Sequence, residues 1–114
     1  MAVIGTVGVG KTSLLMAMLG EMPIEQGTVF VRSGVEIVLA EQEPLIVTGT
    51  VESNILFGLY RDDIWYQKVC WACCLDLDFQ AMPSGDQTKL GEMGHNLSGG
   101  QKSRISLARA LYRS

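Results

Sequence analysis

The sequence lacks any long apolar run. No stretch approaches the roughly 18 to 20 apolar residues that cross a bilayer, and the first residues have neither the charged start nor the long apolar core of a signal peptide. With 47% hydrophobic and 18% charged residues, the 114-residue chain has a globular rather than a disordered composition, sufficient for one domain at most. We therefore expect this segment itself to be soluble.

An excess of positive charge is also missing. Lys and Arg number 9 against 12 Asp and Glu, which gives a formal net charge of −3. No overall basic field therefore favours nucleic acid as a partner. Partners have to be inferred from local motifs.

Metal-binding side chains are scarce as well. Cys70 and Cys73 form a C-x-x-C pattern, but a zinc site needs further ligands, and the chain has no second Cys pair and one histidine, His95, in a different segment. The cysteines are better interpreted as small buried thiols of a reduced compartment. The predicted buried face, at helical spacing, comprises Trp65, Val69, Ala72 and Cys73.

Glycine, in contrast, is frequent near the start of the chain, at positions 5, 8 and 10. Residues 5–12 have the sequence G-T-V-G-V-G-K-T, which matches the phosphate-binding pattern G-x-x-x-x-G-K-S/T at every specified position. Its three glycines allow left-handed backbone turns, so that consecutive N–H groups converge on one phosphate. Lys11 adds a positive charge for the terminal phosphates, and the Thr12 hydroxyl suits a bridging Mg²⁺. This pattern predicts a nucleotide site.

The context of this loop supports that prediction over a glycine-rich turn before an ordinary helix. Residues 2–4 are apolar and typical of the end of a buried parallel strand. Residues 12–19 are expected to form a helix whose N-terminus faces the anion, with Gly20 as its cap. Its apolar face is predicted to be core and consists of Leu14, Leu15, Met18 and Leu19.

Further elements follow from periodicity and capping residues. Residues 28–31 and 35–39 predict two strands joined by a tight turn, and the recurring turn formers of residues 75–96 predict an irregular connection. Three helices are expected: from a Thr50 cap through Ile55 and stopping near Gly58, from an Asp62 or Asp63 cap to about Cys74, and from a Ser98 cap through Tyr112.

The last helix carries two patterns. Its Ser-Gly-Gly opening leaves the first N–H groups uncrowded and predicts a second anion-binding helix terminus. An apolar stripe, formed by Ile105, Ala108, Leu111 and Tyr112, is expected to be buried. A basic stripe, formed by Lys102, Ser106, Arg109 and Arg113, is most simply a solvated surface.

Residues 97–101, L-S-G-G-Q, resemble the signature of the ABC (ATP-binding cassette) ATPases, downstream of a phosphate loop as in that family. Gln42 stands where the family has its Q-loop glutamine. Residues 49–58, 91–94 and 106–110 resemble the C subfamily, which comprises the multidrug-resistance-associated exporters and the chloride-channel relative. The resemblance runs the whole length of the chain.

This resemblance implies an α/β fold of the phosphate-loop NTPase type: a mostly parallel sheet with flanking helices and a helical signalling subdomain. It divides the chain into a phosphate-loop core with strands (1–42), a Q-loop and helical insertion (43–96), and the signature motif with its helix (97–114). The family's adenine-stacking aromatic, Walker B strand, catalytic glutamate and switch histidine are not found. We therefore expect part of a larger domain that alone is inactive or nearly so.

The resemblance also implies the ligands, ATP and Mg²⁺, and the residues that hold them. The phosphate-binding residues of one cassette would be Gly5, Gly8, Val9, Gly10, Lys11, Thr12 and Ser13. The residues that close over the γ-phosphate held by a partner cassette would be Ser98, Gly99, Gly100 and Gln101. Lys11 and Gln42 would be catalytic, and Thr12 and Gln42 would serve Mg²⁺.

The implied function is ATP binding and, in the intact protein, ATP hydrolysis that drives or gates transport across a membrane. The implied partners are a second cassette and the transmembrane domains of the parent transporter, on the cytoplasmic face of the membrane, with no nucleic acid. Two alternatives stay open at this point. One is a regulatory cassette that binds ATP without hydrolysing it, and the other is a soluble ABC ATPase that acts on ribosomes or DNA, against which the C-subfamily-like spacing argues.

Overall fold

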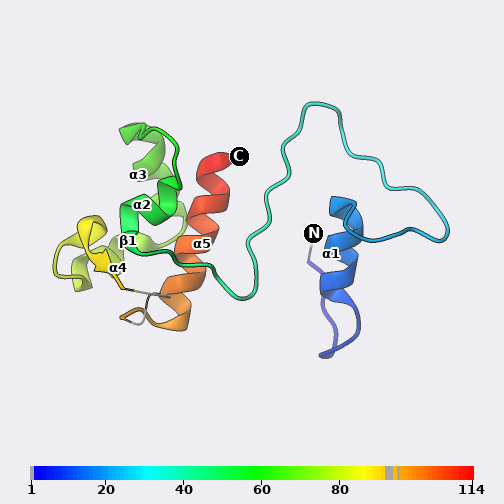
Figure 1. Cartoon of the computed structure of the whole chain (residues 1–114), viewed down its shortest axis with the longest axis horizontal. Coiled ribbons are helices and arrows are strands. Elements are labelled where there is room, and N and C mark those ends of the chain that lie inside the picture. Colours follow the sequence, from blue (N-terminus) through cyan, green and yellow to red (C-terminus); the bar gives the residue numbers. More distant parts are fainter. Residues whose placement is uncertain (1, 92–93, 95) are drawn as a thin grey trace. The chain divides into compact units, whose positions relative to one another are not determined.

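The computed structural model describes residues 2–91, 94 and 96–114, which form two compact units, Met1–Ile37 (unit 1) and Val38–Ser114 (unit 2). The predictions that involve Glu92 and His95 lie outside the described residues. The elements, in chain order (Figure 1), are α1 (Lys11–Leu19), β1 (Gly49–Thr50), α2 (Val51–Leu56), α3 (Asp63–Ala72), α4 (Leu75–Ala81), the 3₁₀ helix η1 (Gly85–Gln87), β2 (Lys89–Leu90) and α5 (Gly99–Arg113). No helix in the described ranges has both the length and the apolarity needed to cross a membrane.

Unit 1 contains α1, which confirms the predicted helix to within one residue. Gly20 ends it in the left-handed conformation, with its N–H bonded to Ala17 O at 3.2 Å. The predicted core face is wrong, because no residue of α1 is buried: Leu14 is 44% and Leu15 45% exposed. A helix buries an apolar stripe only against a second layer, and unit 1 supplies none among its described residues.

The predicted strands at residues 2–4, 28–31 and 35–39 are not formed in the described chain. A strand requires a neighbour to take its backbone hydrogen bonds, and within 28–39 the backbone bond found is that of the predicted tight turn, from Val35 N–H to Arg32 O at 3.3 Å. Phe30 is 92% exposed. The two strands of the described residues, β1 and β2, pair antiparallel, with Gly49 opposite Leu90, so the predicted mostly parallel sheet is not confirmed.

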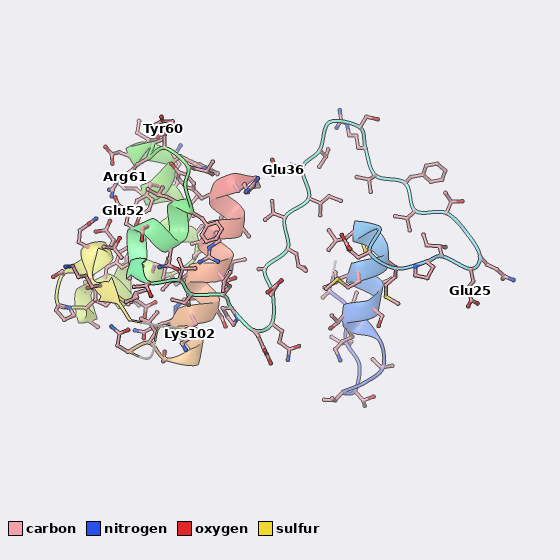
Figure 2. The ribbon with its side chains drawn as sticks, in the orientation of Figure 1. Glu25, Glu36, Glu52, Tyr60, Arg61 and Lys102 are labelled. Atoms are coloured by element: carbon pink, nitrogen blue, oxygen red, sulfur yellow. The ribbon has the colours of Figure 1, made fainter. Side chains whose placement is uncertain are left out.

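The three helices predicted for unit 2, now α2, α3 and α5, begin at the predicted caps. The Thr50 hydroxyl accepts the Ser53 N–H at 3.0 Å and the Asp62 carboxylate accepts the Trp65 N–H at 2.9 Å, which starts α2 and α3. Between these helices Arg61 pairs with Glu52 of α2, as their labelled side chains indicate in Figure 2. Local capping chemistry therefore sets the helix starts.

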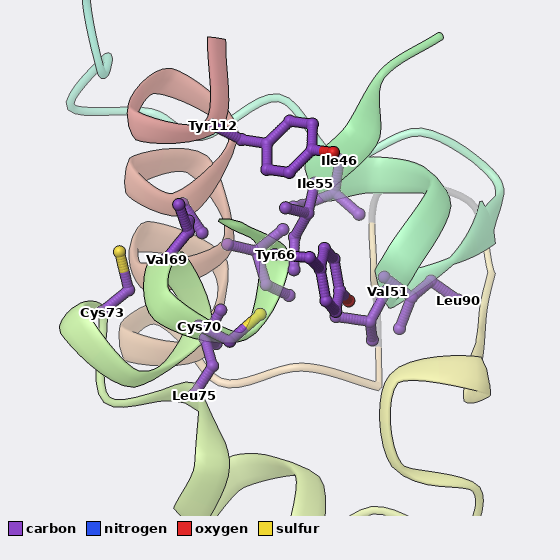
Figure 3. Close-up of a cluster of buried hydrophobic side chains, with 12 residues drawn as sticks. Ile46, Val51, Ile55, Tyr66, Val69, Cys70, Cys73, Leu75, Leu90 and Tyr112 are labelled. Carbon is purple, nitrogen blue, oxygen red and sulfur yellow. The ribbon is translucent and has the colours of Figure 1, made fainter. Parts of the chain in front are cut away.

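The core of unit 2 lies where α2, α3 and α5 meet (Figure 3). Tyr112, near the end of α5, accepts the Asp62 N–H at 2.8 Å and donates its hydroxyl proton to Tyr60 O at 2.7 Å, which fixes α5 to the start of α3. The buried hydrophobic residues are Ile46, Val51, Ile55, Tyr66, Val69, Cys70, Cys73, Leu75, Leu90, Ile105, Ala108 and Tyr112. The apolar stripe of α5 is thus confirmed, with Leu111 packed at its margin.

The buried face of α3 differs from the predicted one. Tyr66, rather than Trp65, points inward with Val69 and Cys70, and Ala72 is exposed. Trp65 sits at the margin, where its Nε1–H donates to Tyr112 O at 3.2 Å. Cys70 and Cys73 are buried as predicted, but Cys74 is exposed in a left-handed conformation (φ 56°) that turns the chain from α3 into α4.

The stretch predicted as an irregular connection, residues 75–96, instead contains α4, η1 and β2. The residues of α4 and its flank that face the core are Leu75, Asp78, Phe79 and Met82, at the helical spacing i, i+3, i+4, i+7. The prediction of an irregular connection is wrong because it rested on the turn formers from Pro83 onward and missed this helical spacing before them.

Candidate functional site

The N-terminus of α1 is open. Gly8 (φ 84°) and Gly10 (φ 98°) adopt the left-handed conformation that a side chain would disfavour, and no side chain caps the helix. The first backbone bond of the helix runs from Leu14 N–H to Gly10 O at 2.9 Å. The N–H groups of residues 11–13 precede it and point outward from the helix start, where the helix dipole favours an anion.

The loop before this helix is curled around the Lys11 ammonium. Lys11 Nζ donates to Gly5 O at 2.9 Å and to Thr6 O at 2.8 Å. A Cβ at Gly5 would lie 2.7 Å from Val9 Cγ1, so a side chain at position 5 would force Val9 to shift. Neutral carbonyl oxygens hold the ammonium less strongly than a phosphate oxygen would, so a phosphate at the helix start can recruit Lys11 from the loop.

Thr12 fits the hard oxygen chemistry of Mg²⁺, because its exposed hydroxyl lies in the first turn of α1. Among the described residues no group of three or more His, Cys, Asp or Glu side chains could hold a metal ion. Gln42 is exposed on a bend of unit 2, and its sharing of a Mg²⁺ with Thr12 of unit 1 stays a prediction.

The N-terminus of α5 is the second predicted anion site. Ser98 caps the helix: its Oγ accepts the Gln101 N–H at 3.2 Å, while Gln101 Oε1 accepts the Ser98 N–H at 2.9 Å. This capping box uses Ser98 Oγ as an acceptor and leaves its hydroxyl proton available to donate. Gly99 and Gly100 are exposed, and their N–H groups precede the first backbone bond of the helix, from Lys102 N–H to Ser98 O at 3.0 Å.

Beneath this turn lies a residue that the sequence did not single out, Asp78 of α4. Its carboxylate accepts Arg104 Nε–H at 2.7 Å and Nη2–H at 2.8 Å, and Gln101 Nε2–H at 3.3 Å. The hydrogen bonds from Arg104 hold the pKa of Asp78 below its ordinary value, despite the opposing effect of burial. In the sequence, the helical spacing of Asp78 from Leu75 and Met82 was the pattern that could have indicated an inward-facing position.

The basic stripe of α5 is not a simple solvated surface. Arg109 donates Nε–H to Asn54 O at 2.7 Å and Nη2–H to Asn54 Oδ1 at 3.1 Å, and its guanidinium carbon lies 4.4 Å from the Phe57 ring centroid. Burial lowers the pKa of Arg109, and Ser106 is 8% exposed. Part of the stripe therefore joins α5 to α2.

The predicted site residues fall into two groups. Unit 1 brings together Gly5, Gly8, Val9, Gly10, Lys11, Thr12 and Ser13; unit 2 brings together Ser98, Gly99, Gly100 and Gln101, and also contains Gln42. The first group surrounds the uncapped N-terminus of α1, and residues 98–101 form the exposed N-terminal turn of α5, which Ser98 and Gln101 cap. The structure adds Asp78 and Arg104 to the second group.

Comparison with known proteins gives the same family for the whole chain. The sequence profile described as ABC transporter matches residues 1–114. The chain is 54% identical over 110 residues to the ATP-binding cassette transporter abc2 of Schizosaccharomyces pombe, covering 96% of this chain and 7% of that protein. It is 49% identical over 112 residues to ATP-binding cassette sub-family C member 4 of Mus musculus, covering 98% and 8%.

A third relative is the vacuolar heme ABC transmembrane exporter abc3 of Schizosaccharomyces pombe, 50% identical over 110 residues, covering 96% of this chain and 7% of the exporter. The chain thus spans 7–8% of the length of these curated relatives. The resemblance to the C subfamily is confirmed.

Proposed function

The chain belongs to the ABC transporter family, whose fold is the α/β fold of phosphate-loop NTPases, and we propose that residues 5–13 bind the phosphates of ATP. The observation that carries this proposal is the open N-terminus of α1 behind two left-handed glycines. The N–H groups of residues 11–13 would donate to the phosphates, and Lys11 would exchange the Gly5 and Thr6 carbonyls for the terminal phosphates.

Mg²⁺ fits the same helix start. Thr12 would supply a hydroxyl ligand, and Gln42 a side-chain oxygen for the ion and for the attacking water. The ion supplies neutralisation of the charge that develops on the transferred phosphoryl group. Lys11 would add a second positive charge, and Ser13 would bind phosphate beside it. ATP hydrolysis in the intact protein is part of this proposal.

The second helix start would act on the nucleotide of a second cassette. Ser98 keeps its hydroxyl proton free to donate, and the N–H groups of Gly99 and Gly100 lie beside it on an exposed turn. Two separate anion-binding helix starts on one chain are accounted for if each serves a different nucleotide in a head-to-tail pair. ATP would then hold the two cassettes together.

We further propose that these 114 residues are part of a longer nucleotide-binding domain whose parent couples ATP to transport. The supporting observations are the names of the relatives, which include transporters and a transmembrane exporter, and their much greater length. Residues 2–4, 28–31 and 35–39 would complete a mostly parallel sheet with other strands of that domain, covering side chains such as Phe30. This segment would lie on the cytoplasmic face of the membrane, where the transmembrane domains of the parent would be its partners.

The test of ATP binding compares Lys11→Ala with Lys68→Ala, an exposed lysine of α3 used as the matched control. Isothermal titration of ATP should give about ten-fold to hundred-fold weaker binding for Lys11→Ala, the loss expected for a charge-assisted hydrogen bond. The control should bind as the wild type does, and both variants should unfold at the wild-type denaturant concentration. Equal ATP affinity in Lys11→Ala and wild type would refute the assignment.

A further inference from the structure

Asp78 occupies an unusual place for a carboxylate. It lies on α4, is 8% exposed, and faces the first two turns of α5 across the unit. Arg104 meets it with two parallel hydrogen bonds, 2.7 Å and 2.8 Å long. Burying a carboxylate is costly unless its partners compensate it, so this pair has to be held in a defined geometry.

The contact continues to the exposed helix start. Gln101 donates Nε2–H to Asp78 Oδ1 at 3.3 Å and, through Oε1, accepts the Ser98 N–H at 2.9 Å. The same glutamine therefore closes the capping box and joins it to α4. Asp78, Gln101 and Ser98 form a continuous chain of hydrogen bonds from the interior to the turn.

The turn needs such an anchor because its sequence favours disorder. Gly99 and Gly100 lose more backbone entropy on ordering than any other residue type would. They also offer no side chains to pack the turn against its neighbours. A Cβ at Gly100 would lie 3.3 Å from Arg104 Nη1, so the guanidinium that pairs with Asp78 also fills the space beside the glycine.

We propose that Asp78 is a positioning residue for the signature turn, residues 98–101 at the start of α5. Through Arg104 and Gln101 it orders this turn, so that Ser98, Gly99 and Gly100 present their hydrogen-bond donors to a phosphate. This inference rests on the proposed function of that turn. Arg104 balances the charge of Asp78, so the anchor does not place an unpaired negative charge beneath an anion site. The lowered pKa of Asp78 agrees with a carboxylate that stays ionised in this role.

The experiment measures steady-state ATPase kinetics of the intact protein that carries these residues. Asp78→Asn should lower kcat about ten-fold while KM for ATP stays within two-fold, because the chain's own phosphate loop is untouched. Arg104→Lys keeps the charge but loses the two-pronged contact, and should give an intermediate kcat. Glu52→Gln is the matched control: it breaks the ion pair with Arg61 elsewhere in unit 2 and should leave both constants unchanged.

A second measurement follows amide hydrogen exchange in the full 114-residue chain. Asp78→Asn should speed exchange at Gln101 and Lys102, whose N–H groups bond to Ser98, about ten-fold relative to wild type, and Glu52→Gln should not. If Asp78→Asn fails to fold, Arg104→Lys carries both measurements.

Three outcomes would overturn the inference. Wild-type kcat in Asp78→Asn, with Ser98→Arg inactive, would refute the role of Asp78 and leave the proposed function standing. Equal losses of kcat in Asp78→Asn and Glu52→Gln would show that Asp78 contributes only to the general stability of the fold. Wild-type kcat in Ser98→Arg would refute the proposed function of the turn at Ser98, and the inference about Asp78 would fall with it.

Discussion

Asn54 of α2 is a buried polar residue that joins three segments of unit 2. It is completely buried, and its side chain makes four hydrogen bonds. Its Oδ1 accepts Val47 N–H at 2.9 Å and Arg109 Nη2–H at 3.1 Å, and its Nδ2 donates to Val47 O and Thr50 O, each at 2.9 Å. One side chain thus joins the segment before β1, the cap of α2 and the middle of α5.

Replacing Asn54 by Ala removes these contacts and leaves their partners inside the fold. A buried group without a hydrogen-bond partner costs about 1–3 kcal/mol. Val47 N–H and Arg109 both lose a bond to Oδ1, while the carbonyl of Asn54 still accepts Arg109 Nε–H. We therefore expect the variant to lose about 3–5 kcal/mol of unfolding free energy, a large part of the 5–15 kcal/mol typical of a domain.

The measurement is urea unfolding of the full chain, followed by tryptophan fluorescence, because Trp65 and Trp71 both lie in unit 2. Asn96→Ala is the matched control: Asn96 is exposed and donates a single bond to Lys89 O at 3.2 Å, so its loss should cost under about 1 kcal/mol. Equal midpoints for Asn54→Ala and Asn96→Ala would refute this assignment of the buried network.

Two further predictions concern the cysteines. Cys74→Gly should raise the unfolding free energy by about 0.5–1 kcal/mol, because Cys74 is exposed and holds a left-handed conformation (φ 56°) that glycine adopts freely. The control Ala72→Gly, within α3, should lower the unfolding free energy by about 1 kcal/mol. A lower unfolding free energy in Cys74→Gly would contradict the argument that Cys74 is strained. Burial raises the pKa of Cys70 from 9.0 to about 11, so iodoacetamide at pH 8 should modify Cys74 first and Cys70 only on unfolding. Because the pKa of Cys70 is higher in the folded state than in the unfolded state, the stability due to its protonated thiol should be complete below about pH 9 and decline toward pH 11. Modification of Cys70 ahead of Cys74 would contradict the burial of Cys70.

Features determined by neighbouring residues could be predicted from the sequence. Thr50, Asp62 and Ser98 start helices because each side chain accepts an N–H group three residues further on, and that pattern is visible in the sequence. The same holds for Gly20, whose left-handed conformation ends α1. The phosphate-loop pattern likewise predicted the left-handed conformations of Gly8 and Gly10, but the same prediction for Gly5 is wrong, because Gly5 is not left-handed.

Features determined by distant partners could not be predicted. Asp78 is separated from Arg104 by 26 residues and Asn54 from Arg109 by 55, so neither hydrogen-bond partner can be identified from the residues nearby in the sequence. On α3, Trp65 and Tyr66 are both amphipathic aromatics, and packing against α5 decides which one points inward. The three predicted strands depend on neighbours in a ladder, which their own sequences do not specify.

The central claim is that the two glycine-rich helix starts, of α1 and of α5, serve different nucleotides, and Ser98→Arg tests it most directly. Calorimetry of ATP binding to monomeric protein, in wild type, Lys11→Ala and Ser98→Arg, separates the two sites. We expect Ser98→Arg to bind ATP within about two-fold of wild type while losing ATP-driven dimerisation and hydrolysis, and Lys11→Ala to lose binding itself by about ten-fold or more. Loss of monomer ATP binding in Ser98→Arg would place Ser98 at the phosphates of its own chain and contradict the account.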